Sequence, residues 1–307
     1  MFHRDPAGPG TWAGNRRGGR AGVGRAILPG VSAPHGAAEP PDRPPATAPA
    51  AELVHVAVTG GVATLTLDSP GNRNALSPRL MAELSGALRG ALADDAVRVI
   101  VLSHTGRVFC SGIDLKAAAA GTAADQPVVA FPDILTAIWH APKPVLARVG
   151  GPARAGGVGL VAACDVAVAG ASATFAFTEV RLGVVPAVIS ATVLPRLLPR
   201  AAHELFLTGE VFDAARAAAV GLVNAAVPDQ DLDAELRRYV DLLLQGAPGA
   251  LAATKALLRR SPGGALAGDL AELTELSARH FASAEGREGM AAFAAKRRPG
   301  WVPAEQP

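Results

Sequence analysis

The feature that most constrains the fold is a glycine-rich turn, residues 150–157, that leads into an apolar segment ending at Ala163. The apolar run before this turn, from Pro144 to Val149, predicts a strand, and the run from Asp165 to Ala169 predicts another. The apolar segment between them predicts a buried helix that opens at Gly156. A strand, a helix and a second strand in this order indicate a layered α/β fold.

The same turn carries a chemical implication. The first N–H groups of a helix have no acceptor within the helix, and such groups hold negative charge well. A second segment, Phe175–Pro186, places one carboxylate, Glu179, among mostly apolar residues. Desolvation raises the pKa of such a group toward neutrality and suits it to carry a proton. Amides that bind an anion, together with a carboxyl group that transfers a proton, suggest a reaction that passes through an enolate.

The pattern of strands and helices continues on both sides of the turn. Residues 54–58 and 62–67 predict two strands joined by a tight turn at 59–61. Ser77 and Pro78 predict the N-cap and first turn of a helix with apolar residues at helical spacing. A buried strand is expected at 97–102 and a helix at 128–140. The alternation reaches about Val227 and predicts a mostly parallel sheet.

Beyond Asp229 the character changes, because the chain predicts helices only, at 232–244, 248–259, 266–284 and 285–297. A helical tail of this kind packs on a partner subunit or caps the core. We therefore expect three regions: a Gly/Pro/Ala/Arg-rich extension at 1–50, an α/β core at 51–228 and a helical oligomerisation region at 229–307.

Residues 1–50 lack periodic apolar positions and cannot bury enough surface to fold, so we expect a disordered extension or an over-long start. Their arginines and scarce acids are reminiscent of an organelle transit peptide, but the prolines and glycines oppose an amphipathic helix. A secretory signal peptide is not expected, because there is no apolar h-region.

Composition narrows the class of protein. A net charge of +2, without a basic stripe interleaved with aromatic residues, argues against a nucleic-acid partner. No apolar run reaches the roughly 18 residues that span a membrane. The two cysteines, Cys110 and Cys164, cannot form a disulfide framework, and neither they nor the seven histidines show metal-ligand spacing. We expect a cytoplasmic protein without a metal.

Several motifs occur in an order that resembles the crotonase (enoyl-CoA hydratase/isomerase) superfamily over roughly residues 52–301. These motifs are Asn72–Leu76, Phe109–Lys116, Gly156–Gly157, the segment around Glu179, and Arg287–Met290 with Lys296–Trp301. The resemblance implies a ClpP/crotonase-like ββα spiral core with a C-terminal helical region. It also implies an acyl-CoA substrate with no separate cofactor, and a homotrimer or homohexamer.

By this resemblance the backbone N–H groups of Ile113 and Gly156 form an oxyanion hole for the thioester oxygen, and Glu179 transfers a proton at C2. Two fixed donors in a dry site stabilise the charge that develops on that oxygen. The other residues that the resemblance assigns to substrate binding are Arg73, Ala75, Gly112, Asp114, Leu115, Lys116, Gly157, Phe293 and Lys296.

One position departs from the pattern of the paired-carboxylate hydratases. They carry a glutamate three residues after the oxyanion glycine, where this chain has Gly159. Hydration would then need Glu179 to act as both base and acid in one concerted step, whereas an enoyl-CoA Δ3-Δ2 isomerase needs only one proton shuttle. Resemblance to bacterial methylglutaconyl-CoA-type hydratases favours the hydratase. A non-catalytic acyl-CoA-binding paralogue is the third possibility.

Two other interpretations are weaker. Gly157, Gly159 and Ala162 match a G-x-G-x-x-A dinucleotide fingerprint, but no acidic residue follows at the expected distance. Cys110 beside Ser111 could act as a nucleophile, but no histidine lies in the neighbouring motifs, so a small buried thiol is expected.

Overall fold

The computed structural model describes residues 51–114, 127–259, 274, 279 and 283–303. The expected extension at 1–50 and most of the expected helix at 266–284 lie outside the described residues. The strands are β1 (Val54–Thr59), β2 (Val62–Leu67), β3 (Val99–His104), β4 (Val145–Val149), β5 (Ala153–Arg154), β6 (Val166–Gly170), β7 (Thr174–Ala176), β8 (Phe212–Asp213) and β9 (Ala225–Val227). The α-helices are α1 (Pro78–Ala93), α3 (Pro127–His140), α4 (Gly156–Ala163), α5 (Ala187–Val193), α6 (Pro199–Thr208), α7 (Ala214–Ala219), α8 (Leu232–Gln245), α9 (Pro248–Leu258) and α11 (Ala284–Ala294). Three 3-10 helices are η1 (Pro70–Asn72), η3 (Thr178–Leu182) and η4 (Asp229–Asp231).

The main sheet has six strands in the order β1-β2-β3-β4-β6-β9. Among the described strands of this sheet only the β1–β2 hairpin is antiparallel, and the other pairs are parallel, as the alternation of strands and helices predicts. The hairpin turns at Gly60 and Gly61, which both have positive φ. A second, small sheet has the order β5-β7-β8 and joins the turn before α4 to the segment that leads to Glu179.

Both faces of the main sheet are covered. On β3 the side chains of Val99 and Val101 pack with an apolar stripe of α8. The intervening Ile100 and Leu102 belong to the larger core cluster, which also holds residues of α1, α3 and α4. A strand buried on both faces is typical of a parallel sheet. Helix α8 is therefore part of the core of this unit.

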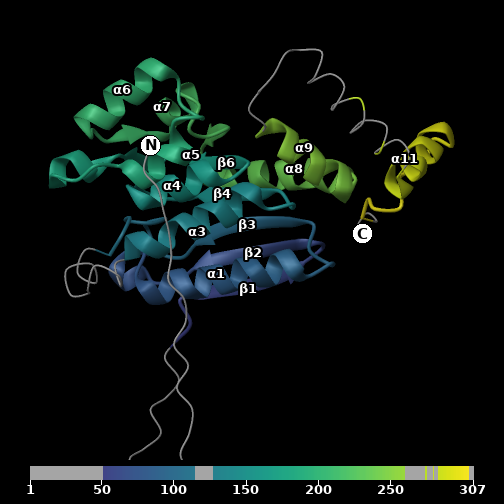
Figure 1. The fold of residues 1–307 in the computed structure, drawn as a ribbon, viewed down its shortest axis with the longest axis horizontal. Helices are drawn as coiled ribbons and strands as arrows, with labels where there is room; N and C mark the ends of the chain where they lie inside the picture. Colours follow the sequence, from purple (N-terminus) through teal and green to yellow (C-terminus); the bar gives the residue numbers. More distant parts are fainter. Residues whose placement is uncertain (1–50, 115–126, 260–273, 275–278, 280–282, 304–307) are drawn as a thin grey trace, which may run out of the picture. The chain divides into compact units, whose positions relative to one another are not determined.

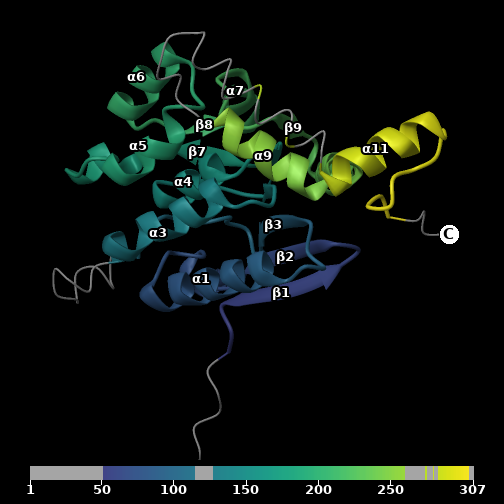
Figure 2. The same cartoon turned by 45° about the vertical axis from the view of Figure 1, so that its right-hand side comes forward.

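Helices α3, α4 and α5 form the layer that carries the candidate site. In both views α4 lies between α3 and α5, and α1 lies along the β1–β2 hairpin (Figures 1 and 2). All eight residues of α4 are buried, so its backbone ends are enclosed by neighbouring elements.

Most expected boundaries agree with the structure to within two residues. Ser77 caps α1, since its hydroxyl accepts a hydrogen bond from the N–H of Leu80 at 3.2 Å. The third strand begins at Val99 and ends at His104, two residues later at each end than expected. The difference arises because Val97 and Arg98 belong to the turn that pairs with Gly61.

Candidate active site

The first amides of α4 are presented by a strained residue. Ala155, the N-cap, has φ 47° and ψ −117°, a conformation that costs a residue with a side chain about 1–3 kcal/mol. Its N–H bonds to the carbonyl of Ala176 in β7 at 3.1 Å, which holds the turn in place. Among the described residues, the N–H of Gly156 donates no hydrogen bond, as expected for the first residue of a helix.

The loop after β3 brings a second bare amide to the same place. The Leu76 N–H donates to the Gly112 carbonyl at 2.8 Å, and the Asp114 N–H donates to the Leu76 carbonyl at 3.3 Å. In this parallel bridge the N–H of Ile113 points away from Leu76 and, within the described part of the chain, donates to no acceptor. Gly112 has φ 91°, and a Cβ atom there would lie 3.5 Å from the Gly156 nitrogen. Gly112 and Gly156 are therefore neighbours.

Asn74 anchors the turn that precedes this loop. Its fully buried side chain accepts from Ser69 N at 2.7 Å and donates to the carbonyls of Thr105 and Val108. The Arg73 carbonyl accepts from Ser111 N at 3.1 Å, so the 72–76 turn and the 109–114 loop form one unit. Asn74 has φ 51°, a conformation that asparagine tolerates better than most residues. The sequence of the 72–76 motif gives no sign of this role, because the partners at Thr105 and Val108 lie more than thirty residues away.

Glu179 lies in η3, three residues after Ala176, the residue that bonds Ala155. Its side chain is half-buried, and the oxygen Oε2 is buried without a hydrogen-bond partner among the described residues. Burial raises the pKa of this carboxyl group above its ordinary value. Neighbouring Arg181 donates to the Thr208 carbonyl at 3.2 Å instead of pairing with Glu179.

The face of α4 beside the amides is apolar. A Cβ atom on Gly159 would lie 2.6 Å from Ile189 Cγ2 and 3.6 Å from Phe131 Cε1, so these side chains fill the space of a side chain at 159. A Cβ atom on Gly156 would meet the Phe131 ring at 3.5 Å. The places of Phe131 and Ile189 beside Gly159 could not be predicted from the sequence, because the contact joins three separate helices.

Comparison with known proteins agrees with this architecture. A model of the enoyl-CoA hydratase/isomerase family matches residues 57–304. The chain belongs to this family. A protein of Rhodobacter capsulatus named a probable enoyl-CoA hydratase is 37% identical over 245 residues, which cover 79% of this chain and 95% of the relative.

Solved structures of the family confirm the crotonase fold that the motifs predict. An enoyl-CoA hydratase of Mycobacterium smegmatis is 34% identical and has a TM-score of 0.76 over 81% of this chain and 98% of that one. An enoyl-CoA hydratase of Mycobacterium avium is 46% identical, with a TM-score of 0.63 over 82% of this chain and all of the other.

The remaining predicted site residues fall into three groups. Arg73, Ala75, Asp114 and Gly157 lie on or beside the two elements that bear the bare amides, with Arg73 exposed and Ala75 and Gly157 buried. Leu115 and Lys116 lie outside the described residues. Phe293 and Lys296, at the end of α11 and just after it, are both exposed, Phe293 by 88%.

Within one chain, the contacts that hold α11 and the segment after it are not at the candidate site. Glu285 accepts from Gly249 N at the start of α9, and Trp301 Nε1 donates to the Gln245 carbonyl at the end of α8. Arg98, just before β3, donates to the Trp301 carbonyl. These contacts lie at the beginning of β3, whereas the loop with Ile113 follows its end. The structure thus does not bring Phe293 and Lys296 to the bare amides of the same chain.

The described residues also bear on the alternative sites. Cys110 is fully buried, and burial raises the pKa of its thiol to about 12, which disfavours a thiolate nucleophile. Within residues 51–114, 127–259 and 283–303, no cluster of three metal-ligating side chains is found. No helix in those ranges has the length and apolarity that a membrane crossing needs.

Proposed function

We propose that the protein is an enoyl-CoA hydratase that adds water across the 2,3 double bond of an enoyl-CoA thioester. The observation that carries this proposal is the unpartnered, buried carboxylate oxygen of Glu179. Its segment follows β7, where the Ala176 carbonyl bonds the N-cap of α4. A desolvated carboxyl group suits proton transfer at a carbon atom, and bare amides suit an oxyanion.

In the proposed reaction the N–H groups of Ile113 and Gly156 bind the thioester oxygen and stabilise the negative charge of the enolate. Glu179 begins ionised and accepts a proton from water as the water oxygen bonds to C3. In the same concerted step the carboxyl group gives a proton to C2, so the net change is the addition of one water molecule. Glu179 returns to its carboxylate form and is ready for the next turnover.

A specific observation favours a second candidate, an enoyl-CoA Δ3-Δ2 isomerase. Ile189 and Phe131 occupy the space beside Gly159, so within the part of the chain that the structure describes these contacts supply no second acid or base there. Isomerisation needs only one: Glu179 removes a proton from C2 of a 3-enoyl thioester and returns it to C4, while the double bond moves to C2–C3. The oxyanion donors act identically in both reactions.

We further propose that the CoA moiety is bound by the residues around the two loops, Arg73, Ala75, Asp114, Leu115 and Lys116, and by Phe293 and Lys296 of a neighbouring subunit. Exposure of Phe293, away from the amides of its own chain, supports a contribution to another subunit. Several apolar side chains are exposed in and just after η3 (Leu182 and Val185) and at and just after the end of α6 (Leu207 and Val211). A homotrimer or homohexamer would cover such a patch, and light scattering that gives the monomer mass would contradict it.

Two finer assignments are also proposals. The first is membership of a branch similar to the methylglutaconyl-CoA-type hydratases. The second is a cytoplasmic location, which is compatible with two cysteines that are both free and buried.

A substrate panel tests the function. Purified protein is offered 2-enoyl-CoA and 3-enoyl-CoA thioesters, and the products are analysed by mass. A gain of one water from the 2-enoyl substrate identifies the hydratase, and conversion of the 3-enoyl substrate without a mass change identifies the isomerase. Binding of CoA thioesters in calorimetry without any turnover would instead identify a non-catalytic paralogue.

A further inference from the structure

Phe131 and Ile189 form a wall on the α4 face beside the oxyanion amides, next to Leu76, whose Cδ1 would lie 2.9 Å from a Cβ atom on Gly156. Gly156 and Gly159 lie one turn apart on this face, and the Phe131 ring contacts the Cβ positions of both. Ile189 Cγ2 occupies the Cβ space of Gly159 from the α5 side. Phe131 is 1% exposed and Ile189 3% exposed, so the wall is tightly packed.

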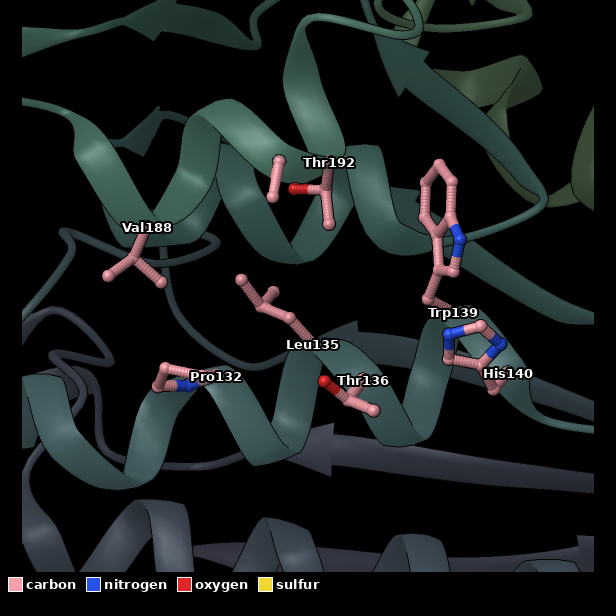
Figure 3. A pocket seen from close by; sticks show the side chains of 8 residues that line it. Pro132, Leu135, Thr136, Trp139, His140, Val188 and Thr192 are labelled. Carbon is pink, nitrogen blue, oxygen red and sulfur yellow. The ribbon is translucent and has the colours of Figure 1, made fainter. Parts of the chain in front are cut away.

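A surface groove runs between α3 and α5, with a cavity of about 270 Å³ (Figure 3). Its walls are mostly apolar, and its lining residues are Pro132, Leu135, Thr136, Trp139, His140, Val188, Ala191 and Thr192. The cavity could hold several methylene groups, because a water molecule takes about 30 Å³ in the liquid.

The groove and the wall are directly adjacent. Pro132 and Val188, at one end of the groove, are the chain neighbours of Phe131 and Ile189. Thr192, on the groove floor, donates from Oγ1 to the Gly159 carbonyl at 3.2 Å. An apolar groove therefore begins directly beside the wall residues.

Resting on the function proposed above, we propose that Ile189 sets the length of the acyl chain that the site accepts. Together with Phe131 it ends the acyl site, so that the substrates are short enoyl thioesters. The α3–α5 groove is a latent extension of the site, which removal of the Ile189 side chain opens to longer acyl chains.

The physical reason is steric. An acyl chain whose thioester oxygen lies at the Gly156 amide meets the wall after a few carbon atoms. Because both wall residues are buried against α4, they cannot move aside without losing their own packing. In an apolar pocket each methylene group that fits or fails to fit changes kcat/KM by about 10–200-fold.

The experiment compares kcat/KM for linear 2-enoyl-CoA thioesters of increasing length in wild type and in Ile189→Ala. We expect wild type to lose at least about tenfold in kcat/KM between the four-carbon and eight-carbon substrates. We expect Ile189→Ala to recover at least about tenfold for the longer one relative to the shorter one. Val193→Ala, which truncates another buried side chain of α5 that does not line the groove, is the matched control and should keep the wild-type preference.

A rescue variant shows whether Ile189→Ala changes the chain-length preference by opening the groove or by loosening the packing of the protein in general. Ala191 is exposed and lines the groove, so Ala191→Trp in the Ile189→Ala background should refill it and restore the short-chain preference. If Ile189→Ala does not fold, Ile189→Val, which keeps the contact to Gly159, should give a smaller shift in the same direction. A wild type that prefers eight carbons, or equal changes in Ile189→Ala and Val193→Ala, would overturn the proposal.

Failure of the proposed function has a different signature. If wild type turns over no enoyl thioester, the dissociation constants of saturated acyl-CoA thioesters are measured by calorimetry in the same variants. The length preference and its loss in Ile189→Ala should appear in binding even without chemistry. Equal affinities for all chain lengths in wild type would then refute the proposal that the wall limits the length of the acyl chain.

Discussion

A Cβ atom on Gly112 would stand 3.5 Å from the amide nitrogen of Gly156, although the two residues belong to different elements. The same atom would lie 3.0 Å from Ala155 Cβ and 3.1 Å from the Arg154 carbonyl oxygen. The loop with Ile113 therefore approaches the start of α4 as closely as a glycine allows. The positive φ of Gly112 adds a second reason for glycine at this position.

We expect Gly112→Ala to reduce kcat/KM by about 10²–10³, because displacement of the loop removes one of the two oxyanion donors. The measurement is steady-state kinetics on the best substrate of the panel, together with a thermal melt. Gly86→Ala is the control, because this α1 glycine is exposed and a Cβ atom there would meet nothing within 4 Å. It should leave activity unchanged and stabilise the helix slightly. Full activity in Gly112→Ala would contradict a role for this loop.

Glu179→Gln should lower kcat by about 10²–10⁴, because the amide can neither accept nor deliver the proton. In wild type the first step requires the carboxylate form. Since burial raises the pKa of Glu179, kcat/KM should fall on the acid side with a midpoint above 4.5, the ordinary glutamate value. A pH profile of kcat/KM with a midpoint at or below 4.5 would remove Glu179 from this role.

The same substitution should stabilise the protein. A group whose pKa is higher in the folded state binds more protons when folded, so stability is lost as pH rises through that pKa. At pH 7 to 8 wild type carries the cost of a desolvated carboxylate, which Glu179→Gln does not. The melting temperature of Glu179→Gln should exceed that of wild type at neutral pH, and the difference should disappear near pH 4. A wild type that is more stable than Glu179→Gln at neutral pH would mean that the carboxylate has a partner.

Local patterns made the architecture predictable. The alternation of apolar runs and turns placed the strands and helices, and Ser77 with Pro78 marked the start of α1, because such signals depend on neighbouring residues alone. The Gly156 turn and Glu179 could be proposed as site residues for the same reason. Each carries its chemical signal within a few residues.

The walls of the site could not be predicted in this way. Ile189 fills the space beside Gly159, and Asn74 joins Ser69 to the loop at Thr105 and Val108. Apart from the bond to Ser69, these contacts join residues about thirty positions apart and leave no periodic trace in the sequence. A glycine inside an apolar helix suggests close packing but does not identify the residue that packs there.

Asp165, two residues after the end of α4, holds α9 against the helices of the site. Its two carboxylate oxygens lie 2.6 Å from Lys255 Nζ and 2.6 Å from an Arg259 nitrogen. The Lys255 and Arg259 side chains are only 8% and 9% exposed, so without Asp165 two buried cations would lose their counter-charge.

Asp165→Asn should therefore destabilise the protein by about 3–5 kcal/mol, measured by urea denaturation at pH 7. The control is Asp233→Asn, which breaks the ion pair with Arg148 at a site where Asp233 is 65% exposed. Exposed pairs contribute only about 0–1 kcal/mol, because water and salt screen them. If both variants lost the same small amount of stability, the cluster around Asp165 would be solvated in solution, and α9 would be held by its apolar contacts alone.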